Sequence, residues 1–304
     1  MKTLFRFKAL SEFHNYSNLP KPEHPLISLV DYSKVNYPKD ANEIKWIQDF
    51  YSIGLKRNVS EKFNYGQQNY DFDEGVLSFV APQQILNIQI NQNIKVNASG
   101  WLLLIHPDFL WNTALAASIK KYDFFGYAVN EALFLSEKEE ANLVELFKNI
   151  QREYQSDIDK FSQNIIISQI ELLLNFAERY YERQFITRKI TNHQILTRLE
   201  ERLNHYFDNP AILANGIPTV NQIANDLNLS PNYLSSVLKA SSGQSTQQHI
   251  HNKLIEKAKE KLSSTELSIS EIAYQLGFEY PASFSKLFKN KTNSSPIEFR
   301  HSFN

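Results

Sequence analysis

Two stretches in the last third of the chain repeat one another, and this repeat decides the fold predicted there. The first reads TVNQIANDLNLSPNYLSSVLK (219–239) and the second reads SISEIAYQLGFEYPASFSKLFK (268–289). Their Ile-Ala pairs, at 223–224 and 272–273, align directly, and the apolar positions that follow align after one extra residue in the second copy. Self-similarity of this kind indicates one supersecondary unit that occurs twice.

Both copies carry the same helix start signals. Thr219 and Ser268 each open a capping box, in which a hydroxyl and a Gln or Glu three residues later satisfy free amides. Pro231 and Pro281 follow where a second helix begins, at a position where a missing N–H does no harm. The pattern therefore predicts a helix, a tight turn and a second helix in each copy, which is the helix-turn-helix pattern.

A single copy would decide little, because two ordinary helical hairpins of an all-α domain show the same apolar spacing. Two copies with matched caps, matched turns and a lysine at the same place favour a DNA-binding domain. A helix predicted over about 246–262 joins the copies, and at about 1.5 Å per residue it spans about 25 Å. With the bulk of the flanking units added, the two second helices would lie about 34 Å apart, one turn of B-DNA. One chain is therefore expected to read two successive major grooves of double-stranded DNA.

From Ile195 to Phe303 the chain resembles the AraC/XylS family of bacterial transcription regulators. The likeness is most specific in IAYQLGFEYPASFSKLFKNKTNSSPIEFR (272–300). In that family the outward positions near the start of each second helix touch base edges, and basic residues close to them lie near phosphates. The resemblance implies base reading by Asn232, Ser235, Ser236, Pro281, Ala282, Ser285 and Lys286, and phosphate contacts by Lys239, Lys253, Lys289 and Arg300.

Two departures from the family pattern affect the first unit. Ser236 stands where the family often has Arg, so the bidentate contact that Arg makes with guanine is missing. His251 and Lys253 replace residues that are commonly more basic. We therefore expect weaker base reading by the first unit than by the second.

The N-terminal part of the chain shows a different pattern. Short apolar runs broken by turn residues lie at 26–32, 50–55, 76–82 and 101–107, and they predict the strands of a sandwich or barrel. From Thr113 onward apolar residues recur three or four apart, which predicts helices. Strands followed by two long helices resemble, loosely, the effector and dimerisation domain of the same family, and this likeness implies a cupin-like β-barrel.

These patterns together predict an α+β protein of two domains. The first is expected to be an effector-sensing and dimerisation domain, and the second an all-α DNA-binding domain with tandem helix-turn-helix units. The first domain is expected over 1–187, with a β-barrel over about 1–112 and helices over about 113–183. The second is expected over 188–304, with its helix-turn-helix units at about 219–242 and 268–292. A connector is expected over 184–194 and a loop over 208–218.

Composition narrows the function classes. The chain has no cysteine, which excludes disulfides, thiolate zinc sites, iron-sulfur clusters and a DNA-repair protein with an acceptor cysteine. Only His14, His24 and His106 precede residue 188, without the His-x-His pair that cupin metal sites use. We expect no metal, no cofactor and no enzymatic activity. Two alternatives stay open, a cupin-type enzyme with a DNA-binding tail and an architectural DNA binder.

Two further segments carry polar groups that suggest a site but are more typical of turns. YDFDEG (70–75) places three carboxylates close together between predicted strands, and His106-Pro107-Asp108 follows a strand directly. Charged or Pro-containing turns between strands are common, so we expect a structural role for both segments.

Charge and hydropathy point to a cytoplasmic regulator. The residues from Arg188 onward carry a small basic excess and the preceding ones a small acidic excess, as expected for a sensor joined to a DNA reader. No apolar run is long enough for a membrane span, and Met1 to Phe13 lack the core of a signal peptide.

The helices at about 137–155 and 160–182, the second apolar on nearly every side, predict a homodimer contact. We expect control by a small-molecule effector or a partner protein, and contact with RNA polymerase, with activation or repression left open.

Overall fold

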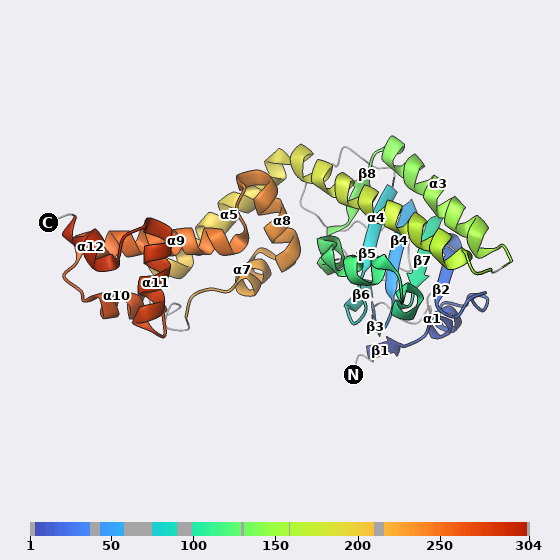
Figure 1. The fold of residues 1–304 in the computed structure, drawn as a ribbon, viewed down its shortest axis with the longest axis horizontal. Helices are drawn as coiled ribbons and strands as arrows, with labels where there is room; N and C mark the ends of the chain where they lie inside the picture. Colours follow the sequence, from blue (N-terminus) through green and yellow to red (C-terminus); the bar gives the residue numbers. More distant parts are fainter. Residues whose placement is uncertain are drawn as a thin grey trace. The chain divides into compact units, whose positions relative to one another are not determined.

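The computed structural model describes residues 4–36, 43–57, 75–89, 99–128, 131–157, 159–209 and 216–302. The chain forms two compact units, Met1–Gln184 and Phe185–Asn304 (Figure 1). The division falls slightly before the boundary expected after residue 187, because one helix continues through it as far as Thr187.

The strands of the first unit form two sheets. One has three strands in the order β1-β3-β6, and the other has five in the order β2-β7-β4-β5-β8. The pair β1 and β3 is parallel, and the other described pairs are antiparallel. The strands are β1 (Leu4–Phe7), β2 (Ile27–Asp31), β3 (Glu43–Gln48), β4 (Tyr51–Arg57), β5 (Gly75–Val80), β6 (Ile85–Gln89), β7 (Ser99–Ile105) and β8 (Leu133–Leu135).

The strands expected at 26–32, 50–55, 76–82 and 101–107 are confirmed as β2, β4, β5 and β7. In β4 every side chain from Tyr51 to Leu55 is buried, as is typical of a central strand with both faces covered.

Apolar side chains fill the space between the two sheets. Phe7 and Trp46 of the three-stranded sheet belong to the same core cluster as Leu102 and Leu104 of β7. Phe13, from helix α1 (Leu10–Tyr16), packs edge-on against Phe7 with ring centroids 5.8 Å apart. Leu102 and Leu104 share one face of β7 because side chains alternate along a strand.

Helices lie against the other face of the five-stranded sheet (Figure 1). Trp101, on the opposite face of β7 from Leu102, stacks on Phe147 of α3 (Glu137–Tyr154) with ring centroids 6.0 Å apart. In α4 (Ser162–Thr187), Gln184 Oε1 accepts a hydrogen bond from the Phe134 amide of β8 at 2.9 Å. The N-terminal unit is therefore a β-sheet region followed by helices, as expected. Shorter elements are α2 (Ala114–Ser118) and the 3₁₀ turns η1 (Tyr32–Lys34), η2 (Pro107–Leu110), η3 (Ile119–Lys121) and η4 (Asp123–Gly126).

The connector expected at 184–194 includes the division between the two units, and it is helical on both sides of Arg188. Helix α4 runs to Thr187 and α5 (Lys189–Asp208) begins after Arg188. Phe185 is buried and packs against the Tyr233 ring at 5.6 Å, and the Asn192 side-chain amide donates to the Phe185 carbonyl. Contacts with residues distant in sequence therefore stabilise a helical conformation that the polar local sequence does not indicate.

Among the described residues of the second unit, the regular elements are all helices. The helices after α5 are α7 (Val220–Leu227), α8 (Pro231–Ser242), α9 (Thr246–Ser264), α10 (Ile269–Gln275), α11 (Pro281–Thr292) and α12 (Pro296–His301). Helix α5 packs through an apolar stripe whose four residues are all buried, Ile195, Leu199, Leu203 and Phe207. The loop expected at 208–218 falls partly outside the described residues.

Two remaining expectations concern turns in the first unit. Of YDFDEG, residues 70–74 lie outside the described part of the chain, and Gly75 begins β5. At the other segment the turn is confirmed, since His106 caps η2 by accepting from the Asp108 amide through Nδ1 at 3.3 Å. In the described part of the chain, no helix is both long enough and apolar enough to cross a membrane.

Candidate DNA interface

The first helix-turn-helix unit consists of α7 and α8. The Thr219 hydroxyl accepts from the Gln222 amide, while Gln222 Oε1 accepts from the Thr219 amide at 2.8 Å, so the expected capping box is present. Asn228 ends α7 in the left-handed conformation at φ 57°, and the Leu229 amide then donates to Ala224 O at 2.9 Å. This left-handed turn sends the chain directly into α8.

The second unit, α10 and α11, repeats this geometry. The Ser268 capping box is present, and Gly277 takes the left-handed conformation at φ 84°. The Phe278 amide donates to Ala273 O at 3.0 Å, which matches the Leu229 bond of the first unit. Ala273 is fully buried, and its small side chain allows the two helices to cross closely. The predicted repeat of two matched units is therefore confirmed in its backbone.

The outer face of α11 carries the candidate base-reading residues of the second unit. Ala282 and Lys286 are exposed, and Pro281 and Ser285 are half-buried. Ala282, Lys286 and the phosphate candidate Lys289 are spaced four and three residues apart, which places them on one helix face. A single face of α11 thus presents all three to the solvent.

On α8 most of the candidate residues are partly buried. Asn232 is exposed, whereas Ser235 and Ser236 are half-buried. The Ser235 hydroxyl forms a hydrogen bond of 3.0 Å with the hydroxyl of Thr246, which is buried at the start of α9. Ser235 therefore also connects α8 to α9, and this contact competes with a role toward DNA.

The four phosphate candidates differ in what already surrounds them. Lys239 and Lys289 are exposed near the ends of α8 and α11. The Lys253 ammonium forms an ion pair of 2.8 Å with Glu256, one turn further along α9. Arg300 donates to the backbone carbonyls of Leu262 at 3.3 Å and Leu267 at 2.6 Å, across the junction of α9 and α10. A phosphate contact by Arg300 would have to use its remaining N–H groups.

One exposed polar residue at the start of α11 was missed from the sequence. Ser283 is exposed, although its counterpart in the repeat, Tyr233, is buried and contacts Phe185. The signal that distinguishes them is the side chain itself, because a small hydroxyl in place of a large aromatic ring indicates a solvent-facing position.

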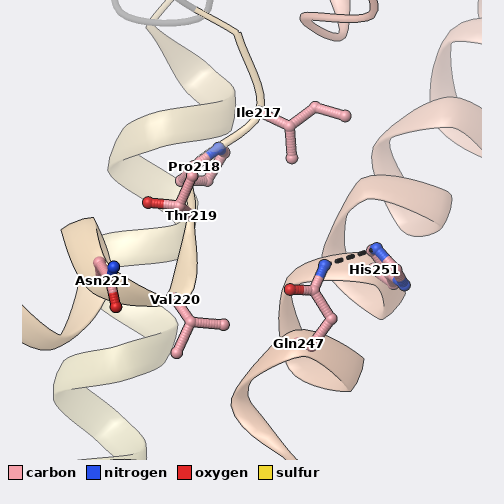
Figure 2. Close-up of a pocket in the computed structure, with 7 residues that line it drawn as sticks. All are labelled: Ile217, Pro218, Thr219, Val220, Asn221, Gln247 and His251. Carbon is pink, nitrogen blue, oxygen red and sulfur yellow. Dashed lines mark hydrogen bonds between the residues drawn. The ribbon is translucent and has the colours of Figure 1, made fainter. Parts of the chain in front are cut away.

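A hollow of about 450 Å³ lies beside the first unit, between the start of α7 and α9. Figure 2 shows Ile217 and Val220 projecting toward the side chains of Gln247 and His251, which are hydrogen-bonded to each other at 2.7 Å. Burial lowers the pKa of His251, and the charge of Lys291 lowers it further. Among the described residues that line the hollow, His251 is the one titratable group, whereas acid-base catalysis typically uses a pair.

Among the residues that the structure describes, no three His, Cys, Asp or Glu side chains are grouped so that they could hold a metal ion.

Comparison with known proteins identifies the second unit. Residues 223–302 match the family described as "Helix-turn-helix domain". The chain is 32% identical over 143 residues to the uncharacterized HTH-type transcriptional regulator YfiF of Bacillus subtilis, covering 47% of this chain and 42% of that protein. It is 38% identical over 81 residues to the Msm operon regulatory protein of Streptococcus mutans, covering 27% and 29% respectively.

Residues 223–302 therefore carry a helix-turn-helix domain similar to those of bacterial transcriptional regulators. A crystal structure of an AraC-type transcriptional regulator from Chromobacterium violaceum is 22% identical, covers 38% of this chain and 96% of that one, and superposes with a TM-score of 0.32. The chain spans less than half the length of the Bacillus and Streptococcus relatives. The match to the helix-turn-helix family lies within the C-terminal unit.

Proposed function

We propose that this protein is a sequence-specific DNA-binding transcription regulator that inserts α8 and α11 into successive major grooves. The observation that carries the proposal is the matched pair of helix-turn-helix units, each with a left-handed turn and a partly exposed second helix. Helix α9, of 19 residues, joins the units and spans about 28 Å at about 1.5 Å per residue. This length suits recognition helices that lie one helical turn of DNA apart.

The AraC/XylS relationship favours a regulator over the cupin-type enzyme, because this is a family of regulators rather than enzymes. The same relationship favours sequence-specific binding over an architectural role. An architectural protein relies on phosphate contacts alone, whereas α11 presents Lys286 beside small residues that allow close approach to base edges.

The direct test is DNA binding by the full chain. Its affinity for a selected duplex should fall steeply as salt is raised, since neutralised phosphates release counterions. It should also exceed the affinity for random duplex by at least about a thousandfold. Equal affinity for both duplexes would support the architectural alternative, and absence of binding would contradict the proposal.

We infer that the β-rich part of the first unit has a cupin-like arrangement that receives an effector. In support, the two sheets enclose one core, and a cavity of about 50 Å³ lies among Trp46, Gln48, Ser52, Lys56 and neighbouring residues. Gln48 is buried and donates to Phe50 O at 2.9 Å and to the Ser52 hydroxyl at 3.0 Å. The space holds little more than a water molecule, so an apolar or aromatic effector would have to displace side chains.

The effector is tested by thermal shift on the full chain. A small aromatic compound that binds here should raise the melting temperature, because ligands of the folded state stabilise it. An unchanged melting temperature across a broad panel of such compounds would favour control by a partner protein.

We further propose that the protein acts as a cytoplasmic homodimer through α4. In support, Phe161, Ile165 and Leu172 are 43% to 55% exposed, and Ile165 and Leu172 lie seven residues apart on one helix face. The exposed apolar surface of α4 is narrower than the sequence suggested, because ten side chains from Ile166 to Phe185 are buried. A second copy of α4 would cover it.

A further inference from the structure

The second recognition helix begins differently from its counterpart in the repeat and from four other helices of its unit, although α5 also starts without a side-chain cap. Helices α7, α9, α10 and α12 each start with a complete capping box. Helix α8 starts with Ser230, whose hydroxyl accepts from the Tyr233 amide at 3.2 Å. At the matching position of α11 stands Tyr280, and no side chain caps the first amides of this helix. The repeat thus differs at the residue that leads into the candidate base-reading face.

A tyrosine at this position lowers the stability of the fold. Ser, Thr, Asp and Asn stabilise a helix start because their short side chains accept from the second or third amide, which Tyr does not do. Tyr280 is also 61% exposed, so its ring gains little from burial. Positions that break a local rule without a gain in folding are typically functional.

The surroundings of Tyr280 favour contact with DNA. Pro281 and Ala282 follow it on α11, and neither side chain can form a hydrogen bond with a base edge. The turn that carries Tyr280 is well fixed, because Phe278 packs on Phe284 with ring centroids 5.4 Å apart. The aromatic ring is therefore held out from a defined turn, next to the face that would enter the groove.

We propose that Tyr280 is a DNA-contacting residue of the second unit, with its ring packed against the sugar and base edges beside the first base pair that α11 reads. This inference rests on the proposed function, since it requires α11 in the major groove. An aromatic ring supplies a large contact area and loses little conformational entropy, because it has two side-chain torsions. The ring thereby supplies contact that the small side chains at 281 and 282 lack.

The substitution Tyr280→Ser tests the proposal in the full chain, because it should change stability and affinity in opposite directions. It introduces the cap that Ser230 provides in the first unit, so the melting temperature of the DNA-binding unit should rise by about 4 °C. The dissociation constant for a selected duplex should rise about tenfold as the ring contact is lost. Tyr280→Phe keeps the ring and should bind within about twofold of the wild type.

Tyr274→Ser is the matched control, since Tyr274 is 58% exposed on α10 and should leave the dissociation constant unchanged. Equal binding by Tyr280→Ser and wild type would overturn the inference and leave the proposed function intact. A tenfold loss accompanied by a lower melting temperature would also overturn it, because misfolding would then explain the loss. A wild type that prefers no duplex would instead overturn the proposed function itself.

Discussion

Two lysines three residues apart on α11 should have separable roles in DNA binding. Lys286 lies five residues after Pro281, about 7.5 Å along the helix at about 1.5 Å per residue, and Lys289 lies about 12 Å along it. The major groove is about 8.5 Å deep. We therefore expect Lys286 to reach base edges, and Lys289 to reach the phosphates at the groove rim.

The two substitutions to alanine should differ in kind. Lys286→Ala should relax preference at one or two base positions, by about 1 to 3 kcal/mol each. Lys289→Ala should lower the salt slope by about 0.9, and by that slope it should weaken binding to every sequence about fivefold at about 0.15 M salt. Fluorescence anisotropy with single-base variants of a selected duplex, over a salt series, measures both effects.

The control is Lys138→Ala, which removes the same charge from an exposed position on α3 and should leave both quantities unchanged. Equal, sequence-independent losses from Lys286→Ala and Lys289→Ala would refute the assignment of Lys286 to base reading. No loss from either substitution would remove α11 from the groove.

Three further predictions follow from buried and exposed groups. The free energy of unfolding should be about 2 kcal/mol higher for a fragment that starts at Phe185 than for one that starts at residue 190, because the longer fragment keeps the buried Phe185 ring. Urea titration of both fragments measures the difference. Leu172→Glu should give monomers in analytical ultracentrifugation, whereas Asn164→Glu, exposed on a different face of α4, should not; a monomeric wild type would contradict the dimer. Burial lowers the pKa of His249 in the folded protein, so as the pH drops the unfolded state binds a proton at this residue before the folded state does. The melting temperature should therefore fall below about pH 6.5, and His249→Asn should weaken this dependence.

The sequence predicts the DNA-binding unit well because its signals are local and occur twice. The capping boxes at Thr219 and Ser268 and the helix starts at Pro231 and Pro281 are all present in the structure. Each depends on residues within one helical turn, so no distant contact can alter the outcome.

Features that depend on distant contacts were predicted less well. The helical course through 184–194 depends on Phe185 packing against Tyr233, almost fifty residues away, and local polarity gave no sign of it. The strands were predicted, but the parallel pairing of β1 with β3 and the order of the five-stranded sheet follow from nonlocal contacts. At the candidate interface, Ser235 is hydrogen-bonded to Thr246, and Arg300 donates to two backbone carbonyls. These hydrogen bonds likewise join residues that the fold brings together.

If one chain reads two successive major grooves through α8 and α11, its binding site should contain two separate blocks of sequence. This can be measured by selecting duplexes from a random pool with the full chain and sequencing them. We expect two enriched blocks about 10 base pairs apart, centre to centre, with the block read by α11 the more strongly defined. A single enriched block, or no enrichment over the starting pool, would contradict this expectation.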